Sequence, residues 1–403
     1  MLTGIFFQGL HPHLPKESLA DMASLAVRIE VLVDGTIPPE SSLSSSAAMT
    51  VCSSIVILES LGVRKHVSRR EMAEVAIESE RYVGVASGGM DQSASIFGHP
   101  NSILHITFHP DLAISHVQMP TCDSSEFTFL IANSLVASDK KVNGPVQYNL
   151  RVVELLIAAR AFATKHNLPL DDSTKTWRKL MAVYFDKNPL PVNGQDPELD
   201  SVREQLGDEA AQIWAISKLV AKDLPQGLTS RLDAEKLTGF KGEAFDKEFL
   251  SQFEICAPNG FNLWNRTRHA FAESLRVHQF RALCISGSDG GPPVAGKALY
   301  ERLGQLMNDS HASLAHDYEN TCPELEGIVS LCRQHGSVGS RLTGAGWGGS
   351  TVHLVPKDKV AEITKALREN FFAKRWPDVS GDRLEASTLE SQPAGGACVL
   401  YLS

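Results

Sequence analysis

The stretch Pro39-Glu40-Ser41-Ser42-Leu43-Ser44-Ser45-Ser46-Ala47-Ala48 places a run of serines directly before an apolar segment, residues 47–61. Residues 26–33 alternate and are rich in β-branched side chains, so the order predicts a strand, a loop and a helix. The start of a helix offers unpaired N–H groups and partial positive charge, which together bind anions such as phosphate. Serine is also a common N-cap, so composition alone favours an ordinary capped helix over a ligand site.

A second motif follows the next predicted helix and reads Val85-Ala86-Ser87-Gly88-Gly89-Met90-Asp91-Gln92-Ser93. Two adjacent glycines allow a tight turn that exposes the side chains after it. Asp91 could take the proton from an attacking hydroxyl or orient that hydroxyl. The alternative is that Asp91 caps a helix that begins at Gln92.

The third motif lies near the C-terminus and reads Gly339-Ser340-Arg341-Leu342-Thr343-Gly344-Ala345-Gly346-Trp347-Gly348-Gly349. Four of its last six residues are glycine, and a predicted strand, residues 351–355, follows. This pattern indicates backbone that closes tightly on a neighbouring group. A glycine-rich turn between core elements would explain it equally well.

In this order and spacing, the three motifs resemble those of the GHMP small-molecule kinases. That superfamily combines a Pro-x-x-x-Gly-Leu-Ser-Ser-Ser-Ala phosphate loop, a Gly-Gly-x-x-Asp-Gln turn and a C-terminal glycine-rich motif. From about Ile29 onward, the amino-acid sequence is similar to that of the galactokinase branch, especially its eukaryotic members. Further segments that carry the likeness are Val33-Asp34-Gly35-Thr36-Ile37-Pro38, Tyr148-Asn149-Leu150-Arg151-Val152-Val153-Glu154 and Leu306-Met307-Asn308-Asp309-Ser310-His311.

The resemblance implies an α+β fold in two lobes, with the nucleotide and the sugar between them. The N-terminal lobe, residues 1–145, would resemble domain 2 of ribosomal protein S5, and the lobe at 146–403 would be ferredoxin-like. The implied reaction is in-line transfer of a phosphoryl group from ATP to the anomeric hydroxyl of galactose, assisted by Mg²⁺.

The resemblance also assigns roles to individual residues. Asp91 would be the catalytic aspartate, and Ser46 would be the Mg²⁺ ligand. The implied phosphate-binding residues are Ser42, Leu43, Ser44, Ser45, Ser46 and Ala47. The implied sugar-binding residues are Gly88, Gly89, Asp91 and Tyr148. Gly344, Gly346 and Gly348 would support the pocket from the second lobe.

The chain departs from the family pattern in two places. The family opens with a segment resembling Gly-Arg-Val-Asn-Leu-Ile-Gly-Glu-His, which supplies a catalytic arginine and sugar contacts, and residues 1–26 contain nothing like it. We therefore expect an incomplete N-terminal lobe and weak activity of residues 1–403 alone. Ser42 stands where the family has glycine, and we expect it to weaken nucleotide binding if the backbone there is left-handed.

Two alternatives remain open at this stage. One is a galactokinase-like protein that binds ATP and sugar and signals through a protein partner instead of catalysing. The other is a kinase for a different sugar, such as N-acetylgalactosamine. Comparing turnover with binding separates the first alternative, and a panel of sugars separates the second.

Composition narrows the possible partners. The chain has 403 residues, of which 43% are hydrophobic, and a formal net charge of −9. This balance argues against broad binding to nucleic acid or anionic membranes, since both require basic surface. No signal peptide or membrane span is expected. The seven cysteines are scattered, so we expect buried free thiols in a reducing cytoplasm rather than disulfides.

Periodicity predicts the remaining elements. Residues 171–208 are polar and the least defined part of the chain. Strands are predicted at residues 103–108, 127–132 and 398–402. Helices are predicted at residues 71–82, 148–166, 209–224, 270–283, 298–314, 322–334 and 358–372.

Overall fold

A computed structural model describes most of the chain. The described residues are 30–37, 41–81, 88–122, 125–137, 147–251, 255–287, 291–292 and 294–401. They form two compact units, one comprising Met1–Met119 with Ser391–Ser403 and the other Pro120–Glu390. The fold mixes helices and sheet, and the helices in the described ranges include none both long and apolar enough to cross a bilayer.

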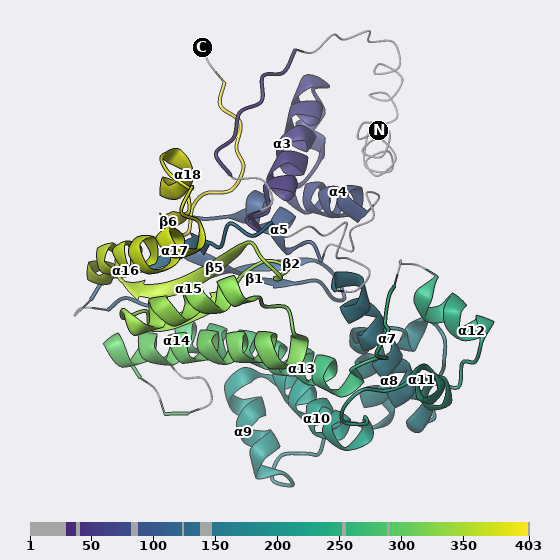
Figure 1. Cartoon of the computed structure of the whole chain (residues 1–403). Helices are drawn as coiled ribbons and strands as arrows, with labels where there is room; N and C mark the ends of the chain where they lie inside the picture. Colours follow the sequence, from purple (N-terminus) through teal and green to yellow (C-terminus); the bar gives the residue numbers. More distant parts are fainter. Residues whose placement is uncertain are drawn as a thin grey trace. The chain divides into compact units, whose positions relative to one another are not determined.

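The first unit packs three helices together and adds a strand pair (Figure 1). The helices are α3 (Ser45–Ser60), α4 (Arg69–Arg81) and α5 (Met90–Phe97), with the short η2 (Arg64–His66) between the first two. Strands β1 (Ser102–Thr107) and β2 (Ala113–Gln118) pair antiparallel. The buried core of this unit includes Val51, Leu58, Met72, Ala73 and Ile96.

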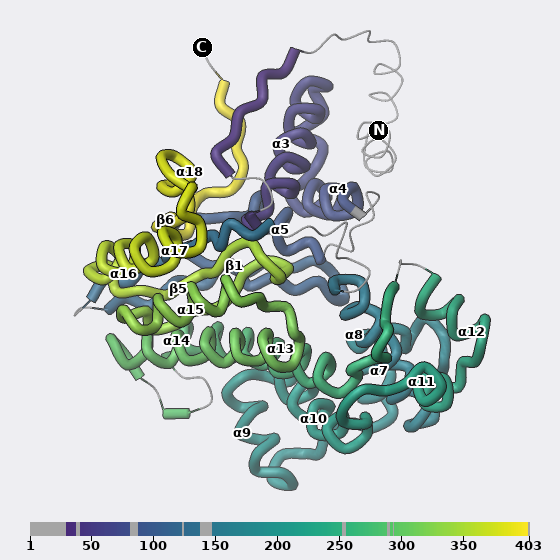
Figure 2. The backbone as a smooth tube through the Cα atoms, in the orientation of Figure 1, coloured from purple at the N-terminus to yellow at the C-terminus, as the bar shows by residue number. Residues whose placement is uncertain are grey.

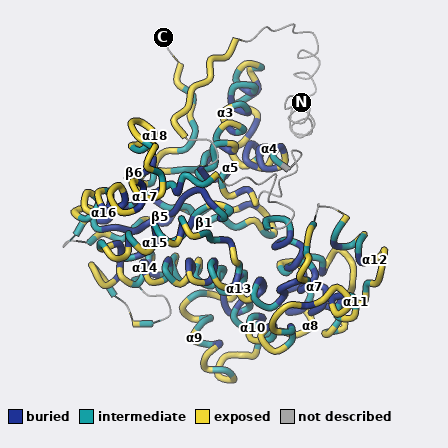
Figure 3. Tube along the Cα trace, in the orientation of Figure 1, coloured by how far each residue is buried: buried dark blue, intermediate teal, exposed yellow. Residues whose placement is uncertain are grey.

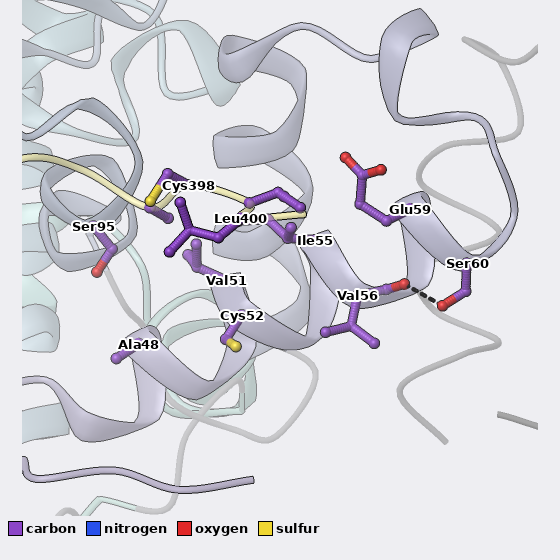
Figure 4. A pocket seen from close by; sticks show the side chains of 12 residues that line it. Ala48, Val51, Cys52, Ile55, Val56, Glu59, Ser60, Ser95, Cys398 and Leu400 are labelled. Carbon is purple, nitrogen blue, oxygen red and sulfur yellow. Dashed lines mark hydrogen bonds between the residues drawn. The ribbon is translucent and has the colours of Figure 1, made fainter. Parts of the chain in front are cut away.

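The C-terminal segment returns to this first unit. The amide of Gly396 donates to the Gly98 carbonyl and that of Ala397 to the Ser95 carbonyl, each at 2.7 Å. Beyond them, residues 397–400 lie along α3 and line an open, mainly apolar pocket of about 620 Å³ (Figure 4). None of the predicted site residues lines this pocket.

The second unit contains a four-stranded sheet with the order β4-β5-β3-β6. Its strands are β3 (Phe127–Asn133), β4 (Gly339–Leu342), β5 (Ser350–Pro356) and β6 (Thr388–Ser391). β5 pairs antiparallel with both β3 and β4. The predicted domain boundary at residue 145 falls inside this unit, because β3 precedes it and already pairs with β5.

Helices α14 (Gly296–Ser313) and α15 (Pro323–Gln334) pack against β4, and α15 also packs against β5. The π-helical turn η5 (Leu314–Tyr318) lies between them in the chain. After β5 come η6 (Lys357–Lys359), α16 (Val360–Leu367), η7 (Arg368–Phe372), α17 (Ala373–Arg375) and α18 (Asp382–Glu385). Leu130, Val355, Ile363, Leu367 and Phe372 form the core beneath these helices.

The rest of the second unit is helical, and Figure 2 follows the chain through it. Its elements are α7 (Tyr148–Lys165), η3 (Asp172–Thr174), α8 (Trp177–Lys187), α9 (Pro197–Leu206), α10 (Asp208–Asp223), α11 (Arg231–Thr238), α12 (Glu243–Phe245), η4 (Asp246–Leu250) and α13 (Leu263–Ser286). Much of α7 is buried (Figure 3), because α8, α11 and α13 all pack against it. Its side chains Val153, Ile157 and Phe162 are completely buried.

Two predicted strands are wrong where the structure describes them. Residues 30–33 and 398–401 are extended but belong to no strand, and 26–29 and 402 lie outside the described residues. Leu32 is 97% exposed and Leu400 83% exposed. A strand requires a hydrogen-bonded neighbour as well as β-branched side chains, and neither segment has a strand neighbour among the described residues.

The cysteines also differ from expectation in one respect. All seven are free, but only Cys332 is buried, whereas Cys52, Cys256 and Cys398 are exposed. Burial alone raises the pKa of Cys284 to about 12, so this thiol is protonated at neutral pH.

Candidate active site

The start of α3 has no side-chain cap among the residues that the structure describes. Ser44 occupies the N-cap position in the left-handed conformation, with φ 61°, and its side chain makes no capping hydrogen bond. Its carbonyl accepts the Ala48 amide at 3.0 Å, so the helix begins directly after it. The exposed Ser46 hydroxyl lies in the first turn. The ordinary-cap interpretation therefore fails, and this helix start suits an anion.

Ser42 has the left-handed backbone that we expected, with φ 58°. Its Oγ is buried and has no hydrogen-bond partner among the described residues. A buried hydroxyl without a partner is costly unless a ligand supplies one. The unpaired hydroxyl is therefore a second cost of serine at this position, beside the left-handed backbone. Ser46, in contrast, supplies the kind of hard oxygen that Mg²⁺ prefers. The described residues include no group of three or more His, Cys, Asp or Glu side chains that could hold a metal ion.

Replacing Ser42 by glycine is expected to raise the free energy of unfolding by roughly 1 kcal/mol. Relief of the left-handed strain contributes roughly 1–2 kcal/mol, which the greater entropy of glycine in the unfolded chain offsets by about 0.5–1 kcal/mol. Denaturant unfolding measures the change, and calorimetric titration with ATP tests the expected gain in affinity. Ser42→Ala is the control, since it keeps Cβ and the strain. If Ser42→Ala raised the free energy of unfolding more than Ser42→Gly does, the buried hydroxyl rather than the left-handed backbone would be what destabilises this position.

The turn before α5 is built around Gly89. Gly89 is the N-cap of α5 with φ 91°, and a Cβ there would overlap Ile77 of α4. Gln92, completely buried, donates to the Glu80 carboxylate and so fastens α5 to α4. Asp91 lies between these two fixed points, in the first turn and partly exposed. The helix starts at Met90, so Asp91 is not its cap, and the backbone that carries its carboxylate is anchored on both sides.

In the second unit, Tyr148 is the first residue of α7 and is partly exposed. It lies near Tyr318 at the end of η5. Burial, with a smaller contribution from the Tyr148 phenol, raises the pKa of Tyr318 to about 12. Tyr318 is therefore neutral at physiological pH.

The glycine-rich loop, defined here as residues 344–349, closes on the turn that follows η5. The Trp347 amide donates to the Asn320 carbonyl at 2.7 Å, and Asn320 Nδ2 donates to the Ala345 carbonyl at 3.1 Å. Trp347 Nε1 donates to the Glu319 carbonyl at 3.1 Å. A Cβ on Gly346 would overlap the Asn320 carbonyl oxygen. The tight closure predicted for this motif is thus confirmed, and its counterpart is residues 319–320.

Helix α14 fixes the strand that leads into the glycine-rich loop. Asn308 Nδ2 donates to the Val338 carbonyl, and Asn308 Oδ1 accepts the Ser340 amide, both at 3.0 Å. His311 Nδ1 accepts the Leu342 amide at 3.2 Å. Burial lowers the pKa of His311, which keeps the ring neutral and Nδ1 available as an acceptor. The segment of residues 306–311 therefore holds both ends of β4.

The structure thus gathers the predicted residues into two groups. Ser42–Ala47, Gly88, Gly89 and Asp91 belong to the first unit, whereas Tyr148, Gly344, Gly346 and Gly348 belong to the second. Residues 1–26, where the family's opening segment was not found, lie outside the described residues. The assignment also left out Arg151 and Glu154, although charged side chains three apart within an apolar helix signal a buried ion pair.

Two segments of the chain match known protein families. Residues 13–99 match the family described as GHMP kinases N terminal domain, and residues 297–373 match GHMP kinases C terminal. The protein is therefore a GHMP kinase by fold and by sequence. In the crystal structure of Lactococcus lactis galactokinase complexed with galactose, the fold superimposes with a TM-score of 0.56, at 24% identity, over 91% of this chain and 69% of that one.

Sequence relatives narrow the class further. A galactokinase of Schizosaccharomyces pombe is 32% identical over 379 residues, and one of Saccharomyces cerevisiae is 33% identical over 392 residues. Each alignment covers 93% of this chain and 71% of the relative. The chain belongs to the galactokinase family.

Proposed function

We propose that the protein transfers the γ-phosphoryl group of ATP to the anomeric hydroxyl of galactose. The observation that supports this most directly is the similarity to two yeast galactokinases over 93% of the chain. The start of α3 and the carboxylate of Asp91 add two of the parts that phosphoryl transfer uses, a phosphate-binding site and a group that acts on the attacking hydroxyl.

In this proposal, the phosphates of ATP bind at the start of α3. The first-turn amides and the Ser44, Ser45 and Ser46 hydroxyls donate to phosphate oxygens, and the helix dipole favours their negative charge. The left-handed backbone of Ser42, with φ 58°, forms the bend that begins this loop. Leu43 and Ala47 complete the loop. Mg²⁺, held by the phosphates and by Ser46 Oγ, would neutralise charge on the transferred group.

Asp91 acts on the sugar. Its carboxylate accepts or orients the proton of the anomeric hydroxyl. The γ-phosphoryl group then passes directly to the hydroxyl oxygen as its bond to ADP breaks, without a phosphoenzyme. Gly88 and Gly89 allow the sugar to approach the turn closely. Within the second unit, Tyr148 is the candidate sugar-binding residue, and Gly344, Gly346 and Gly348 shape the glycine-rich loop. The seven free thiols fit a reducing compartment such as the cytoplasm.

The proposal is tested by incubating the full chain with Mg-ATP and galactose and following ADP release together with galactose 1-phosphate by phosphorus NMR. We expect slow, galactose-dependent turnover, and still slower turnover with N-acetylgalactosamine at equal concentration. Calorimetry with each substrate accompanies the assay. Binding of ATP and galactose without product would overturn the proposal and favour the regulatory alternative, whereas faster turnover of N-acetylgalactosamine would overturn the choice of sugar.

A further inference from the structure

A cluster of buried charges lies beside the glycine-rich loop in the second unit. Glu154 on α7 is 1% exposed and accepts from Arg266 Nε of α13 at 2.9 Å. It also accepts the Asn262 amide at 2.7 Å. Arg151, one turn earlier on α7, lies 3.4 Å from the same carboxylate and is 6% exposed. One carboxylate thus neutralises parts of two buried guanidinium groups.

The remaining donors of both arginines point to the turn after η5. Arg151 Nε donates to the Tyr318 carbonyl at 2.7 Å, and its NH2 donates to the Glu319 carbonyl at 3.4 Å. Arg266 donates to the Asp317 carbonyl and, at 2.6 Å, to the Glu319 carboxylate. These carbonyls belong to the end of a π-helical turn, where carbonyls lack partners within the helix.

This turn has an uncommon backbone that needs support. Glu319 is left-handed, with φ 55° and ψ 48°, a conformation that costs roughly 1–2 kcal/mol for a residue other than glycine. Such a residue persists where its surroundings fix it. Here the guanidinium groups of Arg151 and Arg266 hold the carbonyls on both sides of the bend.

The turn after η5 also holds the glycine-rich loop in place. Glu319 and Asn320 present the carbonyls that accept the indole and amide N–H groups of Trp347. The Arg151 guanidinium also lies 5.6 Å from the centre of the Trp347 ring, within the range of a cation–π contact. Arg151 therefore reaches the glycine-rich loop by two routes, one through the turn and one directly.

We propose that Arg151 is a positioning residue that sets the conformation of the glycine-rich loop through the turn at residues 318–320. A role in stability alone would not require this arrangement, because a buried ion pair often stabilises no more than apolar side chains of the same size. What an apolar side chain cannot supply is donors for two adjacent carbonyls at a bend. The catalytic part of this inference rests on the proposed galactose phosphorylation, whereas the structural part does not.

The test is Arg151→Met, which keeps an unbranched side chain and leaves Glu154 paired with Arg266. Loop conformation is measured without any activity, from acrylamide quenching of Trp347, obtained by subtracting the signal of the same protein carrying Trp347→Phe. We expect Trp347 to become more accessible to quencher in Arg151→Met. We also expect kcat/KM for galactose to fall on the order of 10²-fold, as for displacement of a substrate-contacting group by about 1 Å.

Arg160→Met is the matched control. Arg160 lies on the same helix and is 2% exposed, but its partners are Glu248, Thr174 and the Asp171 carbonyl, none of which contacts the glycine-rich loop. It should lower the midpoint of unfolding without altering Trp347 quenching or KM. Arg151→Lys is the conservative variant. Lysine keeps the positive charge but lacks the planar guanidinium group with its several N–H donors. We therefore expect quenching of Trp347 in Arg151→Lys to lie between that of the unsubstituted protein and that of Arg151→Met.

The outcomes separate the inference from the proposed function. Unchanged Trp347 quenching in folded Arg151→Met, or in Arg151→Lys if the methionine variant does not fold, would overturn the positioning role. Equal changes in quenching for the Arg151 and Arg160 variants would also overturn it, since a general loosening would then suffice. Failure of the proposed function would appear as no galactose-dependent turnover in the unsubstituted protein, and the quenching comparison would remain decisive.

Discussion

Asp91→Asn is expected to lower kcat for galactose by about 10²-fold or more while leaving the fold intact. The amide keeps the size and shape of the carboxylate but cannot take a proton. The surroundings should tolerate the change, because Asp91 is partly exposed and its carboxylate forms no hydrogen bond or ion pair with the residues that the structure describes. The anchors of this turn are Gly89 against Ile77 and Gln92 against Glu80, and both remain.

The measurement is steady-state turnover together with calorimetric binding of galactose and the thermal midpoint of unfolding. Asp111→Asn is the matched control in the same unit. Asp111 is exposed and pairs only loosely with Arg70, at 3.5 Å, so its loss should leave kcat unchanged. If Asp91→Asn kept full kcat with galactose, Asp91 would not be the catalytic carboxylate. A rise in KM alone would limit its role to binding.

Periodicity in the sequence predicted the long helices well because their apolar stripes are continuous. The predicted helix at residues 148–166 is α7 (Tyr148–Lys165), and the predicted helix at 47–61 is α3 (Ser45–Ser60). Gly62, two residues beyond that helix, has φ 66° and donates to the Glu59 carbonyl. These features depend on neighbours in sequence, which is why pattern and propensity sufficed.

The polar region at residues 171–208 contains helices that pattern alone did not reveal. α9 (Pro197–Leu206) begins with Asp196, whose side chain accepts the amides of Glu198 and Leu199, and with Pro197 in its first turn. This start signal was present in the sequence. The helix buries only Leu199, so its apolar stripe was too narrow to be recognised.

For the candidate site, the sequence located the motifs but not the contacts that fix them. Resemblance singled out residues 306–311 without explaining them, and the structure shows Asn308 and His311 fastening β4. Likewise, Asn320 closes on the glycine-rich loop from a segment that no motif marked. Such contacts join residues far apart in the chain, and a single sequence has no pattern that reports them.

Gly346→Ala is expected to destabilise the second unit by about 2–5 kcal/mol, the sum of left-handed strain and overpacking. Gly346 has φ 87°, and its new methyl group would overlap the Asn320 carbonyl oxygen and lie 2.9 Å from Asn320 Nδ2. Asn320 cannot simply move aside. It is 3% exposed, accepts the Trp347 amide and donates to Ala345, so any shift breaks hydrogen bonds on both sides.

Gly239→Ala separates the two costs. Gly239 ends α11 in the same unit with φ 78°, and a methyl group there would meet nothing within 4 Å. Gly239→Ala should therefore lower the free energy of unfolding by only about 1–2 kcal/mol, which is the strain of a left-handed backbone at a residue other than glycine. Urea unfolding followed by tryptophan fluorescence suits both variants, because all five tryptophans, Trp177, Trp214, Trp264, Trp347 and Trp376, lie in the second unit. Equal losses of unfolding free energy in the two variants would contradict the close packing of Gly346 on Asn320. A clearly larger loss in Gly346→Ala would show that the contact with Asn320 leaves no room for a Cβ atom at this position.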